Sequence, residues 1–168
     1  MTRAPIKAAV FDVDGVLTDG LLIFDHEGCE SKAFHSRDGL GLKALMQHGI
    51  EVVILSAREC SAVTHRMRRL GIEHVIQGRE DKQVALQTLL DQLGLSAAEV
   101  AYTGDDLVDW PAMRACGLRC APADADPWLR TQVDVVTTAR GGQGAAREVC
   151  ELLLDRMGQL DAWRQAFD

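Results

Sequence analysis

The stretch Ile6-Lys7-Ala8-Ala9-Val10-Phe11-Asp12-Val13-Asp14-Gly15 is a short apolar run that ends in two carboxylates and a glycine. Carboxylates at the end of a buried strand are costly unless a partner holds them, and a hard divalent cation is such a partner. About ninety residues later, Gly104-Asp105-Asp106 follows another apolar run. The two acidic clusters together predict a metal-assisted phosphoryl-transfer site.

Apolar runs alternate with helical patterns along most of the chain. This alternation predicts an α/β fold, a three-layer, Rossmann-like, doubly wound parallel sheet with both faces covered by helices. The expected strands are residues 6–11, 52–55, 74–76, 100–103, 118–121 and 133–136. The expected helices are residues 39–48, 59–70, 81–93, 108–115 and 143–157.

One segment, residues 20–36, interrupts this alternation. It combines apolar residues 21–24, a polar turn at 25–28 and a second arm at 30–35, which is typical of a β-hairpin. Because ligands of open α/β sheets bind at the carboxyl ends of strands, the hairpin should rise beside the site. We expect a single domain over residues 1–168 without a separate cap domain. The sequence leaves open whether the tail at 158–168 is mobile or docked near a neighbouring site.

Composition limits the possible partners and compartments. The chain has 168 residues and a net charge of −7, which argues against nucleic-acid binding through a broad basic face. No run approaches the roughly 20 apolar residues that span a bilayer, and the N-terminus leads directly into a strand. The five cysteines are scattered, which is typical of reduced thiols. We therefore expect a cytoplasmic protein with no membrane and no nucleic-acid partner.

The acidic residues allow more than one interpretation. Asp12 and Asp14 could divide the work of nucleophile and general acid and base, or could serve only the geometry of a turn. Asp105 could bind a metal, whereas Asp106 could equally cap the following helix. Asp109 could orient the metal ligands or be an ordinary acidic residue of a first helical turn.

Three residues between the clusters could hold an anion. Ser56 ends the second apolar strand, where its hydroxyl and nearby N–H groups could bind phosphate oxygens, although a helix N-cap is an alternative role. Arg58 adds a planar donor fork for carboxylate or phosphate. Lys82 lies in a first helical turn, where the helix dipole disfavours a cation, so a specific anionic partner is expected.

In chain order, these residues resemble the four motifs of the haloacid dehalogenase superfamily. They are Asp12 and Asp14, Ser56, Lys82, and Asp105, each near the end of a strand or the start of the next helix. The resemblance implies that Asp12 becomes transiently phosphorylated, while Asp14 protonates the leaving alcohol and then activates water. It also implies that Ser56 and Lys82 hold the phosphoryl group and that Asp105 helps to bind Mg²⁺.

Further segments resemble one subfamily, the capless 3-deoxy-D-manno-octulosonate 8-phosphate (KDO 8-phosphate) phosphatases. These segments are residues 32–41, Arg58, residues 104–111 and residues 141–148. Ala57 stands where the subfamily usually has glycine, and His35 where it usually has asparagine. The resemblance implies a Mg²⁺-dependent homotetramer of lipopolysaccharide precursor synthesis, in which a neighbour's hairpin helps to close each site.

The same resemblance implies a set of ligand contacts. The substrate, a sugar acid phosphate, would contact Asp14, His35, Ser36, Arg37, Asp38, Gly39, Lys43, Ser56, Arg58, Arg66 and Lys82. Mg²⁺ would be held by Asp12, Asp105 and the backbone carbonyl of Asp14, with Asp106 and Asp109 supporting them. Asp14 would be kept protonated by the negative charge of a carboxylate and a phosphate close by.

Other functions stay open at this point. The nearest is a phosphatase for an N-acylneuraminate 9-phosphate or another sugar phosphate, although relatives acting on the nine-carbon substrate usually have glutamate in place of Arg58. A phospho-accepting signalling receiver also uses acidic residues, serine or threonine and lysine, but its phospho-accepting aspartate lies on a later strand. A catalytically silent relative of the same fold is a third alternative.

Overall fold

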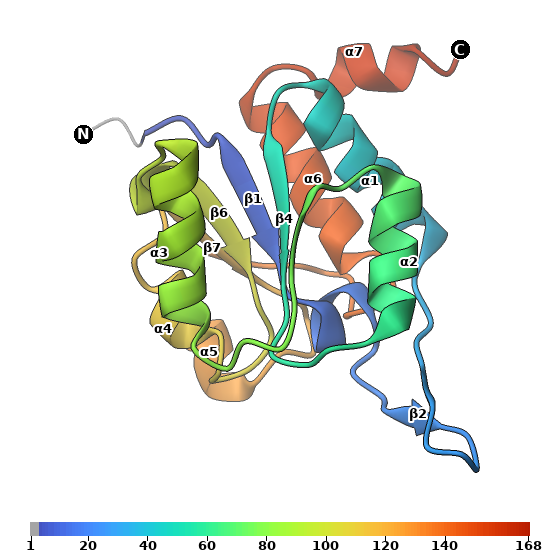
Figure 1. Cartoon of the computed structure of the whole chain (residues 1–168). Coiled ribbons are helices and arrows are strands. Elements are labelled where there is room, and N and C mark those ends of the chain that lie inside the picture. Colours follow the sequence, from blue (N-terminus) through green and yellow to red (C-terminus); the bar gives the residue numbers. More distant parts are fainter. Residues whose placement is uncertain (1–3) are drawn as a thin grey trace.

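A parallel sheet forms the centre of the computed structural model, which describes residues 4–168 (Figure 1). Its strands run in the order β5-β4-β1-β6-β7-β8, and every neighbouring pair is parallel. They are β1 (Ala8–Phe11), β4 (Glu51–Leu55), β5 (His74–Ile76), β6 (Val100–Thr103), β7 (Leu118–Ala121) and β8 (Val135–Val136). The predicted α/β class with a parallel sheet is confirmed.

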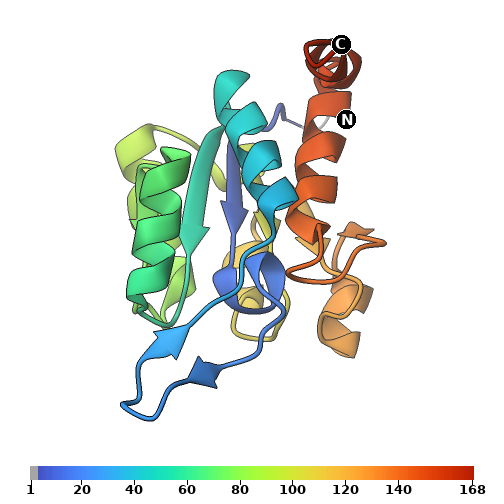
Figure 2. The same cartoon turned by 90° about the vertical axis from the view of Figure 1, so that its right-hand side faces the viewer.

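Helices cover both faces of this sheet. On one face lie α1 (Ser36–Gln47), α2 (Ser61–Leu70) and α6 (Ala145–Arg156), and on the other α3 (Lys82–Leu93), α4 (Trp110–Met113) and α5 (Pro127–Gln132) (Figures 1 and 2). A short 3₁₀ turn, η2 (Ala97–Glu99), leads into β6. None of the helices in residues 4–168 has the length and apolar character needed to cross a membrane.

The side chains of β1 point alternately to the two faces of the sheet, and this alternation explains the two layers of the core. Ala9 and Phe11 point into one apolar cluster with α1, α2 and α6, whereas Ala8 and Val10 point into the other with α3, α4 and α5. All four side chains are fully buried. Burial on both faces is why this strand is a continuous apolar run in the sequence.

The polar residues that follow β1 lie at a reversal of the strand order. The chain runs outward from β1 through β4 to β5 and then crosses back to β6 on the other side of β1. Such a switch point leaves a crevice at the carboxyl ends of the two central strands. A π-type turn, η1 (Val13–Leu17), leads the chain away from β1 and closes with a hydrogen bond from the Thr18 N–H to the Val13 carbonyl (3.0 Å).

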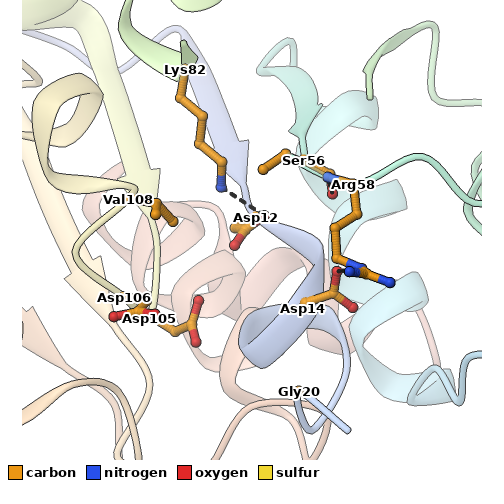
Figure 3. A pocket seen from close by; sticks show the side chains of 10 residues that line it. Asp12, Asp14, Gly20, Ser56, Arg58, Lys82, Asp105, Asp106 and Val108 are labelled. Carbon is orange, nitrogen blue, oxygen red and sulfur yellow. Dashed lines mark hydrogen bonds and ion pairs between the residues drawn. The ribbon is translucent and has the colours of Figure 1, made fainter. Parts of the chain in front are cut away.

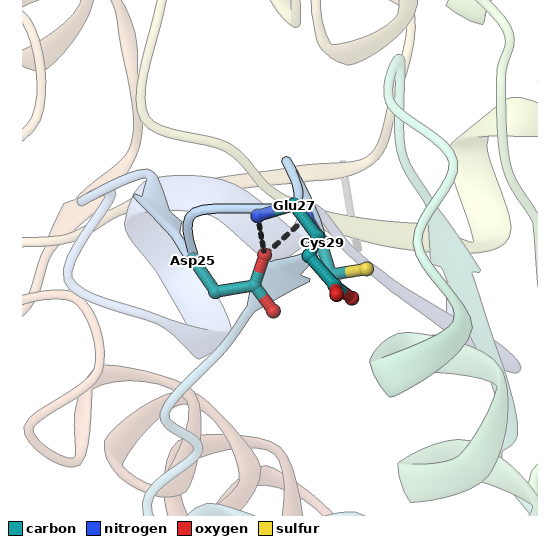
Figure 4. A group of neighbouring side chains, drawn as sticks. All are labelled: Asp25, Glu27 and Cys29. Atoms are coloured by element: carbon teal, nitrogen blue, oxygen red, sulfur yellow. Dashed lines mark hydrogen bonds between the residues drawn. The ribbon is translucent and has the colours of Figure 1, made fainter.

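The inserted hairpin projects beyond this edge of the sheet (Figure 2). It consists of β2 (Ile23–Phe24) and β3 (Glu30–Ser31), which pair antiparallel. Its tip is shaped by Asp25, whose Oδ1 accepts hydrogen bonds from the N–H groups of Glu27 and Cys29, both at 2.9 Å (Figure 4). An aspartate that accepts from backbone groups just ahead of it is a common turn device. The polar turn predicted here therefore serves the turn geometry.

Two helices lie outside the predicted set. One is α5, and the other is α7 (Leu160–Gln165), formed by the tail that the sequence left open between mobile and docked. Trp163 of α7 is buried against the core, and the guanidinium of Arg147 lies 4.6 Å from the centre of its ring. The tail is therefore packed on α6 of its own chain.

Candidate active site

A cleft of about 240 Å³ lies at the carboxyl edge of β1, β4 and β6 (Figure 3). It is lined by Asp12, Asp14, Gly20, Ser56, Ala57, Arg58, Lys82, Asp105, Asp106 and Val108. The lining residues come from four separate segments of the chain, and all the predicted motif residues that end strands are among them. The fold therefore brings the residues of the four motifs together.

Asp12 lies at the bottom of this cleft, one residue beyond β1. Its Oδ1 accepts a hydrogen bond from the Val13 N–H at 2.7 Å and lies 3.0 Å from the Nζ of Lys82. Lys82 is the first residue of α3, and its side chain is almost fully buried. The same ammonium lies 2.7 Å from Oδ1 of Asp109. The anionic partner predicted for Lys82 is thus a pair of carboxylates.

Asp109 supports the cleft from behind. It is fully buried, and its Oδ1 also accepts a hydrogen bond from the Tyr102 hydroxyl at 3.0 Å. Its Oδ2 accepts from the N–H groups of Asp105 at 3.0 Å and of Asp106 at 3.4 Å. Of the two alternatives for Asp109, the structure favours the one in which it orients other site residues. Asp106 is exposed and accepts from the Leu107 N–H, so it does not cap α4, which starts at Trp110.

The charge of this cluster suits a divalent cation. Oxygen atoms of Asp12, Asp105 and Asp109 lie within 4.8 Å of one another, and the ammonium of Lys82 pairs with two of them, Asp12 and Asp109. Burial and the neighbouring Asp109 raise the pKa of Asp12 to about 7 and the pKa of Asp105 to about 8. Three carboxylates beside one ammonium leave an excess of negative charge, and carboxylate oxygens are the ligands that Mg²⁺ prefers. The donor set therefore fits Mg²⁺. We call these four residues the acidic cluster.

Gly15 allows the two acidic segments to approach each other. Its φ is +87°, which lets the backbone turn sharply after Asp14. A Cβ at this position would lie 2.0 Å from Oδ2 of Asp105. Both the backbone conformation and the available space require glycine here. Residues with a side chain rarely adopt this φ, and a Cβ atom would overlap the carboxylate of Asp105.

Ser56 and Arg58 border the cleft from the loop after β4. The Ser56 hydroxyl accepts a hydrogen bond from the Arg58 N–H at 3.2 Å, and its side chain is buried. Because α2 starts at Ser61 with Cys60 before it, the N-cap alternative for Ser56 is wrong. No non-glycine residue within 4–168 has a positive φ, so Ala57 occupies the usual glycine position without backbone strain.

The hairpin adds two charged residues that the sequence analysis did not identify. The Nζ of Lys32 forms an ion pair with Oδ1 of Asp14 and lies 2.7 Å from Oε1 of Glu30. The Nη2 of Arg58 lies 3.1 Å from Oε2 of Glu30, and its Nε lies 4.0 Å from Oδ2 of Asp14. Asp14, Lys32, Glu30 and Arg58 thus form a closed ring of alternating charge, which we call the hairpin ring. Figure 3 shows Arg58 and Asp14 facing each other.

The pKa values of Glu30 and Lys32 reflect this pairing. The hydrogen bond from Lys32 holds the pKa of Glu30 below its ordinary value. Burial acts to lower the pKa of Lys32, but its hydrogen bonds to Asp14 and Glu30 outweigh burial and raise it. The structure also places two cations, Lys32 and Arg58, beside the carboxylate of Asp14.

The other predicted substrate contacts do not line this cleft. His35, Asp38, Gly39 and Arg66 gather instead around a separate small pocket at the start of α1. Ser36, Arg37 and Lys43 are exposed on α1. Contact between these residues and a substrate stays a prediction.

Asp38 differs most from its expected role. Its carboxylate is buried, and Oδ1 accepts a hydrogen bond from the Arg147 N–H at the start of α6, at 2.9 Å. Burial raises its pKa. Asp38 faces α6 rather than the cleft, so in this structure it joins the first turns of two helices.

Comparisons with known proteins agree with this architecture. The sequence profile of the haloacid dehalogenase-like hydrolases matches residues 74–149. The chain is 47% identical over 162 residues to the 3-deoxy-D-manno-octulosonate 8-phosphate phosphatase KdsC of Salmonella typhi, covering 96% of this chain and 86% of that protein.

Crystal structures of similar proteins extend the agreement to three dimensions. A KDO 8-phosphate phosphatase from Moraxella catarrhalis, in complex with magnesium, phosphate and KDO, superimposes with a TM-score of 0.94 at 44% identity, covering 97% of this chain and 94% of that one. A KDO 8-phosphate phosphatase from Yersinia pestis gives a TM-score of 0.91 at 44% identity, covering 93% and 84%.

The fold and the cleft together define a hydrolase of the haloacid dehalogenase type. Within this class, the chain belongs to the family of the 3-deoxy-D-manno-octulosonate 8-phosphate phosphatases. The receiver alternative fails because Asp12 follows β1, the first strand, rather than a later one.

Proposed function

We propose that this protein is a Mg²⁺-dependent phosphatase that hydrolyses KDO 8-phosphate to KDO and inorganic phosphate, a step of lipopolysaccharide precursor synthesis. The observation that carries the proposal is the position of Asp12 at the bottom of the cleft, between the ammonium of Lys82 and the carboxylate of Asp105. A nucleophile, a fixed cation and an acidic pair meet there, which is what phosphoryl transfer requires.

In the first half-reaction, a carboxylate oxygen of Asp12 attacks phosphorus and the bond between phosphorus and the sugar oxygen breaks. Asp14 gives its proton to the departing alkoxide, which leaves as the alcohol. The product on the enzyme is the phosphorylated carboxylate of Asp12. The lining of the cleft by both residues supports this division of roles.

In the second half-reaction, a water molecule attacks the phosphorus of phosphorylated Asp12, and phosphate leaves. Asp14, now a carboxylate, takes a proton from that water and returns to its starting form. Lys32 and Arg58 lie beside the carboxylate of Asp14 at the mouth of the cleft, where Asp14 can act as the base in this step.

Lys82 and Ser56 border Asp12 where the phosphoryl oxygens would lie. The ammonium balances part of their charge, and the hydroxyl can donate a hydrogen bond. Asp12 and Asp105, with the backbone carbonyl of Asp14, would hold Mg²⁺, and Asp109 and Asp106 would support them. Mg²⁺ offsets the repulsion between the Asp12 carboxylate and the phosphate dianion.

Phosphate release from KDO 8-phosphate, with Mg²⁺ and with a chelator, tests the proposal. We expect turnover that needs the metal and that exceeds turnover of an N-acylneuraminate 9-phosphate by at least tenfold. Arg58 at the mouth of the cleft supports the eight-carbon substrate, because relatives that act on the nine-carbon substrate usually have glutamate at this position. A preference for the nine-carbon substrate, or turnover unaffected by the chelator, would contradict the proposal.

We also propose that the chain forms a homotetramer. The hairpin exposes four consecutive apolar side chains, Leu21, Leu22, Ile23 and Phe24, at 64%, 48%, 49% and 53%. Beside the cleft, Leu107 and Val108 are also exposed. Contiguous exposed apolar residues favour an interface, and a neighbour's hairpin over the cleft would cover both groups.

Light scattering tests the assembly, with the variant Ile23→Asp to disrupt it. We expect a tetramer for the natural chain, and smaller species with reduced turnover for the variant. A fully active monomer at assay concentration would contradict the proposal. The unpaired state of all five cysteines supports a cytoplasmic location, which cell fractionation would test.

A further inference from the structure

The second strand of the hairpin reaches back into the site of its own chain. Glu30 and Lys32 are two residues apart, so they share one face of the extended backbone. That face is turned toward Asp14 and Arg58, which come from the segments after β1 and β4. The hairpin is thus joined to the site by ion pairs between side chains, in addition to the backbone that connects it to η1 and α1.

Lys32 is the most confined member of the hairpin ring. Only 1% of its side chain is exposed, although its neighbours in the hairpin are largely open to solvent. A buried ammonium is costly unless its hydrogen bonds are satisfied, and here carboxylates of Asp14 and Glu30 satisfy them. The long side chain is therefore held in one position against Asp14.

Glu30 and Arg58 complete the arrangement around Lys32. Glu30 accepts from Lys32 through Oε1 and from Arg58 through Oε2, so that its carboxylate has a cation on each oxygen. The backbone carbonyl of Glu30 also lies 3.8 Å from the Sγ of Cys60. Glu30 therefore anchors Lys32 to the loop after β4 without touching Asp14.

We propose that Lys32 is a positioning residue that fixes the orientation of the Asp14 carboxylate for proton transfer, and that Glu30 acts through Lys32. This inference rests on the proposed function, in which Asp14 protonates the leaving alcohol. Lys32 binds Oδ1 of Asp14, so rotation of the carboxylate about its terminal bond is restricted. A fixed proton donor shortens the search for the reactive geometry and raises the rate of the chemical step.

The test compares two leaving groups. An alkyl phosphate such as KDO 8-phosphate needs a proton on its departing oxygen, whereas p-nitrophenyl phosphate releases a stable phenolate that needs little protonation. For Lys32→Met we expect kcat/KM to fall about 10- to 100-fold on the alkyl phosphate and less than about threefold on the aryl phosphate. Lys32→Arg should recover part of the loss, because it keeps the charge.

Glu30→Gln and the double variant test the order of action. Because Glu30 acts through Lys32, the double variant should lose no more activity than Lys32→Met alone. Lys7→Met is the matched control, since Lys7 also pairs with a glutamate but lies before β1, at the opposite end of that strand from the site. It should leave both values of kcat/KM unchanged.

Asp14→Asn separates this inference from the proposed function. If Asp14→Asn shows the leaving-group difference and a folded Lys32→Met does not, Lys32 has no positioning role while Asp14 keeps its own. Equal losses on both substrates for Lys32→Met would also overturn the inference. A crystal structure of Lys32→Met tests the inference without substrate. We expect the Asp14 carboxylate in a different orientation or in two alternative conformations. An unchanged orientation of this carboxylate would overturn the inference.

Discussion

The acidic cluster contains Asp12 and the hairpin ring contains Asp14, and both residues line the same cleft, yet the charges of the two groups are organised differently. In the acidic cluster, three carboxylates lie close together and only one ammonium pairs with them, and all four residues come from the sheet edge or from helix starts. In the hairpin ring, two carboxylates alternate with two cations, and half of the members come from a small inserted hairpin.

This difference in balance separates two tasks. An excess of negative charge in a buried place attracts a divalent cation and makes a carboxylate available to attack phosphorus once the cation is bound. A ring with no excess charge has little attraction for a further ion, and its members mainly fix one another in space. We therefore assign metal binding and nucleophilic attack to the acidic cluster, and to the hairpin ring the orientation of Asp14, which transfers the proton.

Asp12→Asn gives the largest expected effect. Replacement of the nucleophile should lower kcat by at least about 10³-fold, because no other carboxylate occupies its position. The amide keeps the shape and can still accept from the Val13 N–H, so circular dichroism should show an intact fold. Substantial turnover by a well-folded variant would show that Asp12 is not the nucleophile. The acidic cluster would then have no chemical role that distinguishes it from the hairpin ring.

Lys82→Met is expected to be the most destabilising of these changes. It leaves Asp12 and Asp109 buried beside each other without their shared cation, which typically costs about 3–5 kcal/mol when one partner of a buried ion pair is lost. Urea unfolding in the absence of metal measures this loss. Lys7→Met, at an exposed pair, serves as the control and should change little. A variant as stable as the natural chain would show that Lys82 is not needed to offset the repulsion between the buried carboxylates of Asp12 and Asp109.

Removal of Mg²⁺ should affect the acidic cluster alone. A cation that binds only the folded chain stabilises it by about 2.7 kcal/mol at a concentration of 100 times its Kd. Thermal unfolding with MgCl₂ and with a chelator measures the effect. Asp105→Asn should lose most of this stabilisation, because it removes one of the three carboxylates, whereas Glu30→Gln should keep it. Equal loss in both variants would mean that the two regions share one metal-dependent role.

The sequence was sufficient for the sheet and for the acidic cluster because both depend on local patterns. Continuous apolar runs marked the parallel strands, and the carboxyl ends of such strands meet at one edge. Asp12, Ser56, Lys82 and Asp105 could therefore be placed at one site from their order along the chain and their positions at strand ends and helix starts.

The hairpin ring depends on how the hairpin folds over, and spacing does not determine this. The spacing of Glu30 and Lys32 can indicate that the two side chains share a face, but not what that face contacts. Likewise, the contact of Asp38 with Arg147 joins residues 109 positions apart, which no local pattern reports. The short helix α5 could have been found, since Asp126 followed by Pro127 is a typical helix start.

The smallest expected effect comes from the amino edge of the sheet, where Lys7 and Glu99 form an exposed pair at 2.6 Å. Hydrogen bonds from Lys7 and from the N–H and hydroxyl groups of Ser96 together lower the pKa of Glu99 from 4.5 to about 2. Because the folded chain favours the ionised form, the stabilisation is complete above pH 4.5 and disappears as the pH falls to about 2. The melting temperature of Glu99→Gln should therefore lie slightly below that of the natural chain at neutral pH and converge with it in acid. A gap that persists at about pH 2 would mean that packing, rather than charge, holds Glu99. The pair of Lys7 and Glu99 could then not serve as an exposed reference for the charge interactions in the acidic cluster and the hairpin ring.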